Sequence, residues 1–167
     1  MNTRFWIRLV VGIWAALVFR LTVGPKLAIA GVQPDLLAAY VFYLTLARGA
    51  RTGIIAGFVL GLLVDVDRPE GVGLTSLVWS TMAYLTAIIS DAVESSDAIV
   101  AAAVLFVVML AGETIRSILI AGLEPGRIGL IWIRWVLPTA LYTAIAAPLL
   151  AVAIHSVTGD SRWFGAR

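Results

Sequence analysis

Six apolar stretches, separated by short polar breaks, constrain this chain more than any other feature of its sequence. They cover about residues Phe5–Val23, Asp35–Ala47, Gly53–Val64, Leu74–Ser90, Ala98–Ala121 and Ile128–Ile154. A helix that crosses a bilayer takes roughly 20 apolar residues, so six crossings take about 120. Because the chain has 167 residues, the remainder suffices only for loops and tails. We therefore predict an all-α integral membrane protein, a six-helix transmembrane bundle forming one domain over residues 1–167.

The composition excludes most soluble functions. Hydrophobic residues make up 61% of the chain and charged residues 13%, with a mean hydropathy of +1.00. Soluble domains are about 45–50% apolar and roughly 25% charged. A soluble enzyme, nucleic-acid-binding protein or disordered regulator of this composition would leave its surface apolar. The lack of cysteine and the single histidine remove thiol catalysis and Cys or His metal sites, so we expect no cofactor and no metal.

The second and third stretches are unusually short. As helices of about 13 residues they reach about 20 Å, whereas the hydrocarbon core of a bilayer is about 30 Å thick. Residues 48–52 join them into a predicted hairpin, in which Arg48 and Arg51 extend to one membrane interface. We expect the other ends of this hairpin to stop below the opposite surface and leave a recess.

The sixth stretch is longer than one crossing requires. Its first turns contain Trp132, Arg134 and Trp135, and aromatic and basic residues are typical of membrane interfaces. We predict that these turns lie along the interface as an anchor. Pro138 and Pro148 are expected to bend the helix that follows.

The basic residues predict the orientation in the membrane. An even number of crossings places both tails and the 48–52 loop on one side, and the side with more Lys and Arg in short loops is cytoplasmic. That side carries Arg4, Arg8, Arg48, Arg51, Arg162 and Arg167, against Lys26, Arg68 and Arg127 on the other. Both termini are therefore predicted to be cytoplasmic, in a protein that crosses its membrane several times.

The first stretch allows a second interpretation. Basic residues, an apolar run from Leu9 to Phe19 and the sequence Ala28-Ile29-Ala30 resemble a cleavable signal peptide. Arg20 and Lys26 make a poor cleavage region, which favours a retained first helix.

Glycines recur every four residues at the start of the third stretch. Gly49, Gly53, Gly57 and Gly61 lie nearly along one side of a helix, and in lipid such small residues let a neighbouring backbone approach closely. We predict a helix-packing face here, within this protein or against a helix of another protein. Leu60 is expected on the other side of the helix, where truncation to alanine is milder.

Charged residues inside or beside the apolar stretches are candidates for function. Glu113 and Arg116 lie three residues apart in the fifth stretch, so we predict an intramembrane ion pair, with a ligand or proton-linked site as the alternative. Arg20 either anchors the first helix at the interface or joins Glu113 in a buried triad.

Two acidic clusters occupy the loops. The turn after the third stretch contains Asp65, Asp67 and Glu70 together with Arg68. We expect it to be either a solvated polar turn or a contact for a partner. Asp91, Glu94 and Asp97 precede the fifth stretch, where they cap that helix or present a negative edge to a partner.

One segment resembles a known family. Its residues are Pro34-Asp35-Leu36-Leu37, Arg48-Gly49, the glycines to Gly61-Leu62, Asp65, Gly71 and Gly73-Leu74. From about Pro34 to Leu85 they resemble the rod shape-determining MreD family. The resemblance implies a non-enzymatic inner-membrane scaffold of the cell-elongation complex that supports peptidoglycan synthesis and cell shape. It also implies association with MreC, and through MreC with MreB and the RodA–penicillin-binding transpeptidase pair.

The resemblance also supplies the alternative function. The MreD family is similar in fold to the substrate-binding subunits of energy-coupling-factor vitamin transporters, which need a polar and aromatic pocket. For the scaffold, the expected partner contacts are Asp65, Asp67 and Arg68 in the turn, with Trp132, Arg134 and Trp135 in the sixth stretch. We also expect contact with membrane lipid, and we expect no binding of nucleic acid.

Overall fold

The computed structural model describes residues 31–66, 71–92, 97–121 and 125–158, together with Val18, Thr22, Lys26 and Ala28. These residues form helices and no β-strand, which confirms the all-α fold class. In chain order the helices are α2 (Leu36–Arg48), α3 (Ala50–Asp65), α4 (Leu74–Ala92), α5 (Ala98–Ala121), α6 (Pro125–Ile131), the π-helical η3 (Trp132–Val136) and α7 (Leu137–Thr158). The first apolar stretch lies outside the described residues, so the six-helix bundle stays a prediction.

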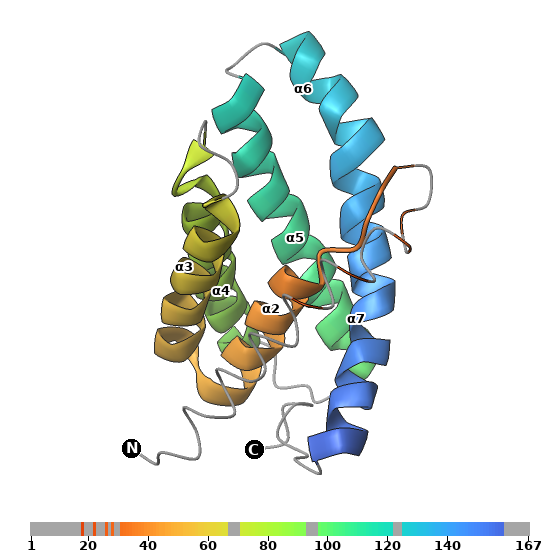
Figure 1. Ribbon diagram of the computed structural model, residues 1–167. Coiled ribbons are helices and arrows are strands. Elements are labelled where there is room, and N and C mark those ends of the chain that lie inside the picture. Colours follow the sequence, from red (N-terminus) through yellow and green to blue (C-terminus); the bar gives the residue numbers. More distant parts are fainter. Residues whose placement is uncertain are drawn as a thin grey trace.

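The second to fifth apolar stretches correspond to α2 to α5, with ends that agree within three residues. Figure 1 shows these helices and α7 side by side, with α3 and α4 on one flank and α5 and α7 on the other. We name the two ends of the bundle after the residues at the ends of α3 and α2, Asp65 and Arg48. At the Asp65 end α3 leads to α4 and α5 to α6, and at the Arg48 end α2 leads to α3 and α4 to α5.

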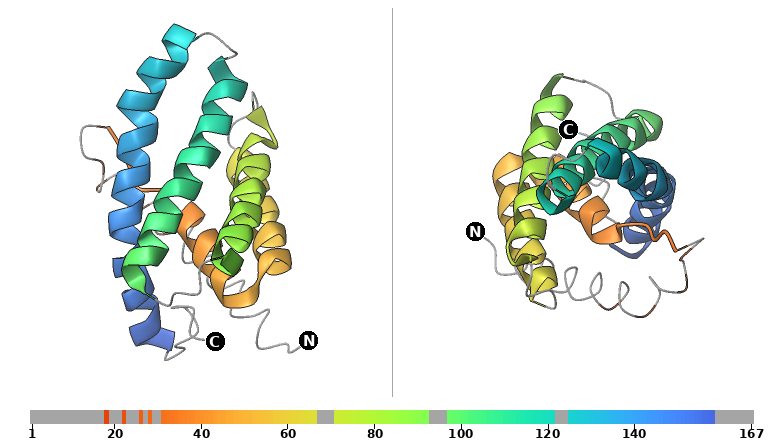
Figure 2. Two further views of the ribbon diagram at one scale, coloured as in Figure 1. Left: turned by 180° about the vertical axis from the view of Figure 1, so that it is seen from behind. Right: turned by 90° about the horizontal axis from the view of Figure 1, so that it is seen from above.

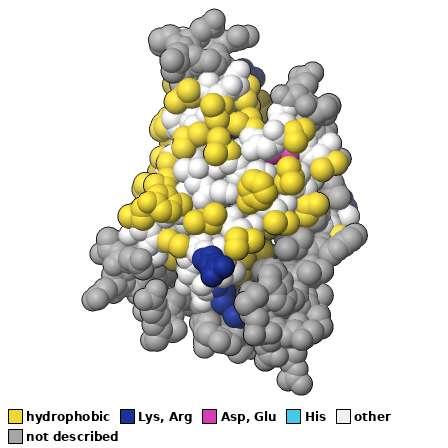
Figure 3. All heavy atoms as spheres, turned by 90° about the vertical axis from the view of Figure 1, so that its left-hand side faces the viewer, with side chains coloured by type: hydrophobic (Ala, Val, Ile, Leu, Met, Phe, Trp, Pro, Cys, Tyr) yellow, Lys and Arg dark blue, Asp and Glu magenta, His cyan; other side chains and the backbone are white. Residues whose placement is uncertain are grey.

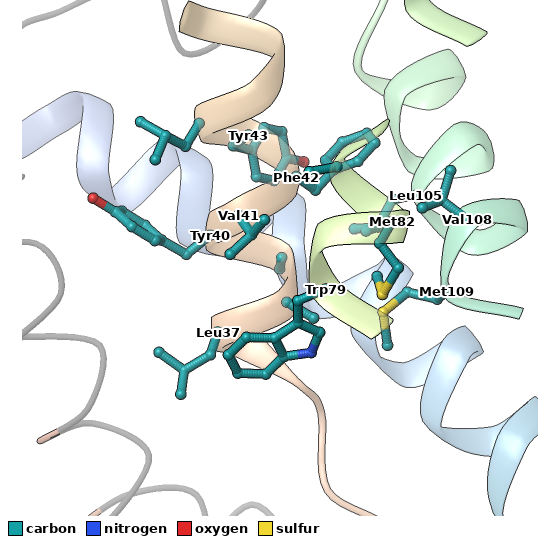
Figure 4. Packing of buried hydrophobic residues seen from close by; sticks show 14 of the residues in the cluster. Leu37, Tyr40, Val41, Phe42, Tyr43, Trp79, Met82, Leu105, Val108 and Met109 are labelled. Carbon is teal, nitrogen blue, oxygen red and sulfur yellow. The ribbon is translucent and has the colours of Figure 1, made fainter. Parts of the chain in front are cut away.

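The short helix α2 lies in the middle of the bundle. Its residues from Leu37 to Thr45 are all buried, and it contacts α3, α4, α5 and α7. Viewed along the bundle in Figure 2, α2 runs between the α3–α4 pair and the α5–α7 pair. Figure 4 shows its side chains beside Trp79 and Met82 of α4 and Met109 of α5. Because other helices enclose it, α2 does not need the length of a lipid-facing span.

The start of α2 is fixed by hydrogen bonds inside the bundle. The carboxylate of Asp35 accepts the backbone N–H of Ala38 at 3.1 Å, and the Asp35 N–H donates to Thr143 Oγ1 of α7 at 2.9 Å. Thr143 is fully buried. Away from water, the free N–H groups of a helix start need such partners, so the sequence Pro34-Asp35 both starts α2 and attaches it to α7.

The sixth apolar stretch forms one long helix with a widened turn. In η3 the N–H of Leu137 donates to the carbonyl of Trp132, five residues earlier. Pro138 follows, and its ring would clash with the carbonyl four residues before it in a regular α-helix, so the π-turn accommodates the proline. The expected distortion is therefore local at Pro138, whereas α7 continues through Pro148.

Two helices among the described residues are long and apolar enough to cross a membrane: Ile99–Ile120 in α5, and Gly129–Pro148 across α6, η3 and part of α7. Shorter apolar helices cover Leu36–Arg48 and Leu74–Ser90. Large apolar side chains also cover the outer face of α3 and α4, with basic side chains toward the Arg48 end (Figure 3). This surface is consistent with a membrane protein.

Candidate functional site

Three glycines of α3 allow close contact with neighbouring helices. A Cβ added to Gly57 would lie 2.9 Å from the carbonyl carbon of Trp79, and one added to Gly61 would lie 2.7 Å from that of Thr75, both in α4. A Cβ on Gly53 would lie 2.8 Å from the Cβ of Thr45 in α2. These contacts occupy the glycines with helices of this chain.

The structure corrects two predictions about this helix, those for Gly49 and Leu60. Gly49 has φ +84° between α2 and α3, and a Cβ there would meet nothing within 4 Å. It permits a tight turn and takes no part in helix packing. Leu60 is fully buried, so its position away from the glycines does not make its truncation to alanine the milder change that the sequence suggested. A helix packed on more than one flank buries more than its glycine face.

Asp65 joins the end of α3 to the start of α4. One of its carboxylate oxygens, Oδ2, accepts the backbone N–H groups of Gly73 and Thr75, each at 2.9 Å, and that of Ser76 at 3.4 Å. The side chain is buried, with 1% of the residue exposed. A helix start inside this chain therefore uses the carboxylate of Asp65, so the solvated turn expected here is wrong for this residue, and its contact with a partner stays a prediction. Asp67 and Arg68 lie outside the described residues.

The structure brings Glu113 and Arg116 together on α5. Arg116 Nε lies 3.5 Å from Glu113 Oε1, and only 18% and 16% of the two side chains are exposed. The next polar residue, Ser117, donates from Oγ to the carbonyl of Glu113 at 2.7 Å. Arg20, the third member of the possible triad, lies outside the described residues.

The tryptophans of η3 face this polar part of α5 and the chain before α2. The Trp132 indole N–H donates to Thr114 Oγ1 at 2.8 Å, which ties η3 to α5. The indole N–H of Trp132 is therefore used within this chain, and its place at the membrane interface stays a prediction. The ring of Trp135 lies beside Gly31, whose added Cβ would be 3.7 Å from Trp135 Cη2. Arg134, which lies between the two tryptophans in the sequence, is exposed.

Sequence reasoning missed the polar contacts between helices, such as Trp132 with Thr114 and Asp35 with Thr143. Residues 108 or 18 positions apart give no local signal for pairing. Within the described ranges no group of three His, Asp or Glu side chains converges to hold a metal ion. The described residues offer buried helix caps, the Glu113–Arg116 ion pair and an apolar exterior, which suit packing and association.

Comparison with known families decides the relationship. The family model described as rod shape-determining protein MreD matches residues 3–157, nearly the whole chain. The protein belongs to the MreD family. Membership in MreD supports a role in determining cell shape, and MreD is a structural component of shape determination rather than a known enzyme family. The match extends the resemblance seen around Pro34 to Leu85 over the other helices.

No curated protein and no solved structure matches the chain. None of the comparisons supports the alternative of a vitamin-transporter subunit. MreD membership and the apolar helices together are consistent with a membrane protein.

Proposed function

We propose that this protein is a non-enzymatic scaffold of the cell-elongation complex in the bacterial inner membrane, with both termini cytoplasmic. It binds MreC, and through MreC the MreB filaments and the RodA–penicillin-binding transpeptidase pair. The match of residues 3–157 to the MreD family carries this proposal.

The described polar groups support a role in association. Asp35 and Asp65 cap helices, and Trp132 bonds to Thr114, so each is occupied within the chain. A protein built in this way offers its partners the exposed helix faces and the loops. Its effect on peptidoglycan synthesis then comes from holding other proteins together.

One exposed face suits a transmembrane helix of MreC. Along α6, η3 and α7 the large apolar residues at spacings of three and four are exposed: Leu130, Ile133, Leu137, Leu141 and Ile145. We name these five residues the α6–α7 stripe. Such spacing places them on one side of the helix, as knobs for a second helix. Arg134 and Trp135 beside the stripe supply charge and an aromatic ring at the Asp65 end.

Co-purification of MreC from membranes tests this proposal. Arg134→Glu and Leu141→Trp should lower MreC recovery without lowering the membrane level of this protein. The matched controls are Arg51→Glu, an exposed arginine at the Arg48 end, and Leu77→Trp, an exposed leucine on α4. Full MreC recovery with Arg134→Glu and with Leu141→Trp would contradict docking on this face. If charge reversal of Asp91 and Asp97 then abolishes MreC recovery, docking belongs to the loop between α4 and α5.

A further inference from the structure

Arg116 has unused hydrogen-bonding capacity at the Asp65 end of α5. Its Nε and Nη2 atoms are buried and find no hydrogen-bond acceptor among the described residues. Glu113 Oε1, at 3.5 Å from Nε, is close enough for an ion pair but does not complete a hydrogen bond. A guanidinium held out of water without acceptors is costly, so an external acceptor would stabilise it.

The position of Arg116 along α5 fits the headgroup region of a bilayer. The apolar span of α5 ends at Ile120, four residues beyond Arg116, which is about 6 Å along a helix axis. An arginine side chain readily covers that distance by extending toward the interface. In the structure the guanidinium turns back toward Glu113, and an extended side chain would carry it to the depth of the lipid phosphates.

Apolar residues flank Arg116 on the same side of the helix. Leu119 and Ile120 follow it by three and four residues, so they lie one turn further toward the end of α5. They are 53% and 67% exposed. The helix face directly beyond the guanidinium is therefore open and apolar, as a surface for acyl chains requires.

A phosphate ester matches the unused donors. Guanidinium is always protonated, donates only, and presents its N–H groups in a fork that fits two phosphate oxygens. We propose that Arg116 binds the phosphate group of an anionic membrane phospholipid, whose acyl chains lie against Leu119 and Ile120. Glu113 competes with the phosphate for the guanidinium.

Native mass spectrometry of the purified full chain, with dioleoylphosphatidylglycerol titrated into the detergent, tests the site. Arg116→Gln should lower the apparent lipid affinity about tenfold, because it removes charge-assisted hydrogen bonds. Arg51→Gln, a matched change at an exposed arginine outside both proposed sites, should leave the affinity unchanged. Glu113→Gln should maintain or raise it, since the internal competitor for Arg116 loses its charge.

A second variant and a lipid without phosphate serve as further controls. If Arg116→Gln does not fold, Arg116→Lys should show a smaller loss, since it keeps the charge without the fork. Dioleoylglycerol, which lacks phosphate, should not be retained. Equal losses of lipid affinity for Arg116→Gln and Arg51→Gln would overturn the site in favour of general charge attraction. If Glu113→Gln lowers the lipid affinity as much as Arg116→Gln does, the ion pair has only a structural role. If inorganic phosphate stabilises the protein as strongly as the lipid does, a phospholipid is not the ligand.

Discussion

The carboxylate of Asp65 at the end of α3 accepts the backbone N–H of Thr75 at the start of α4, at 2.9 Å. One buried oxygen thus satisfies donors that the first turn of α4 leaves free. The same oxygen also accepts from Gly73, so it fixes the direction of the chain entering α4.

Asp65→Ala should lower the free energy of unfolding by about 1–3 kcal/mol, because buried N–H groups lose their acceptor. Asp65→Asn keeps an oxygen at the same place and should cost less. Thermal melting in detergent measures both, with the exposed Arg51→Gln as control. Equal melting temperatures for Asp65→Ala and Arg51→Gln would contradict the capping role.

Gly57→Ala and Gly61→Ala should each destabilise the protein by about 1–3 kcal/mol, because the new methyl group meets the backbone of α4. Gly126→Ala is the matched control in α6, where a Cβ meets nothing within 4 Å. It should be neutral or slightly stabilising, since alanine favours helix. Folded yield and melting temperature distinguish the two sets. A loss at Gly126 as large as at Gly57 would show that close packing is not the cause.

Leu60→Ala should cost about 2–5 kcal/mol, the usual range for a buried leucine. Leu63, also in α3, is 48% exposed, and Leu63→Ala should be much milder. The comparison in one detergent melting assay is direct because both changes remove the same atoms from the same helix. Equal effects would mean that α3 is packed differently from the arrangement described.

Trp132→Phe and Thr114→Val should each lower the free energy of unfolding by about 1 kcal/mol through loss of one partly buried hydrogen bond. The double variant should cost less than the sum, since both changes remove the same interaction. A double-mutant cycle of melting free energies measures the coupling. If the two losses of unfolding free energy simply add, Trp132 and Thr114 do not interact in the detergent-solubilised protein.

A cysteine at position 161 tests the predicted cytoplasmic C-terminus, because the natural chain has no cysteine. In intact cells Ser161→Cys should be protected from an impermeant maleimide and react only after the membrane is opened. Labelling in intact cells would reverse the orientation derived from the basic residues.

The sequence by itself determined the class of the protein and the course of its helices. Residues such as Pro34-Asp35 and Gly49 bound the apolar stretches, and in the structure a helix starts after Asp35 and another ends before Gly49. The glycines before Asp65 and the residues around them also carried the family resemblance, which the match over residues 3–157 confirmed. These features are local, so neighbouring residues suffice to encode them.

Only the tertiary structure decided which side of each helix is inside. In a soluble helix the polar face marks the exterior, but in a chain this apolar both faces carry the same side chains. Leu60 is buried and Leu63 half exposed, although the two residues are chemically identical. Likewise Asp65 reads as a solvated turn residue until α4 folds back and places three N–H groups around its carboxylate. The burial of a residue in such a bundle depends on which helices become its neighbours, and residues distant in the chain decide that.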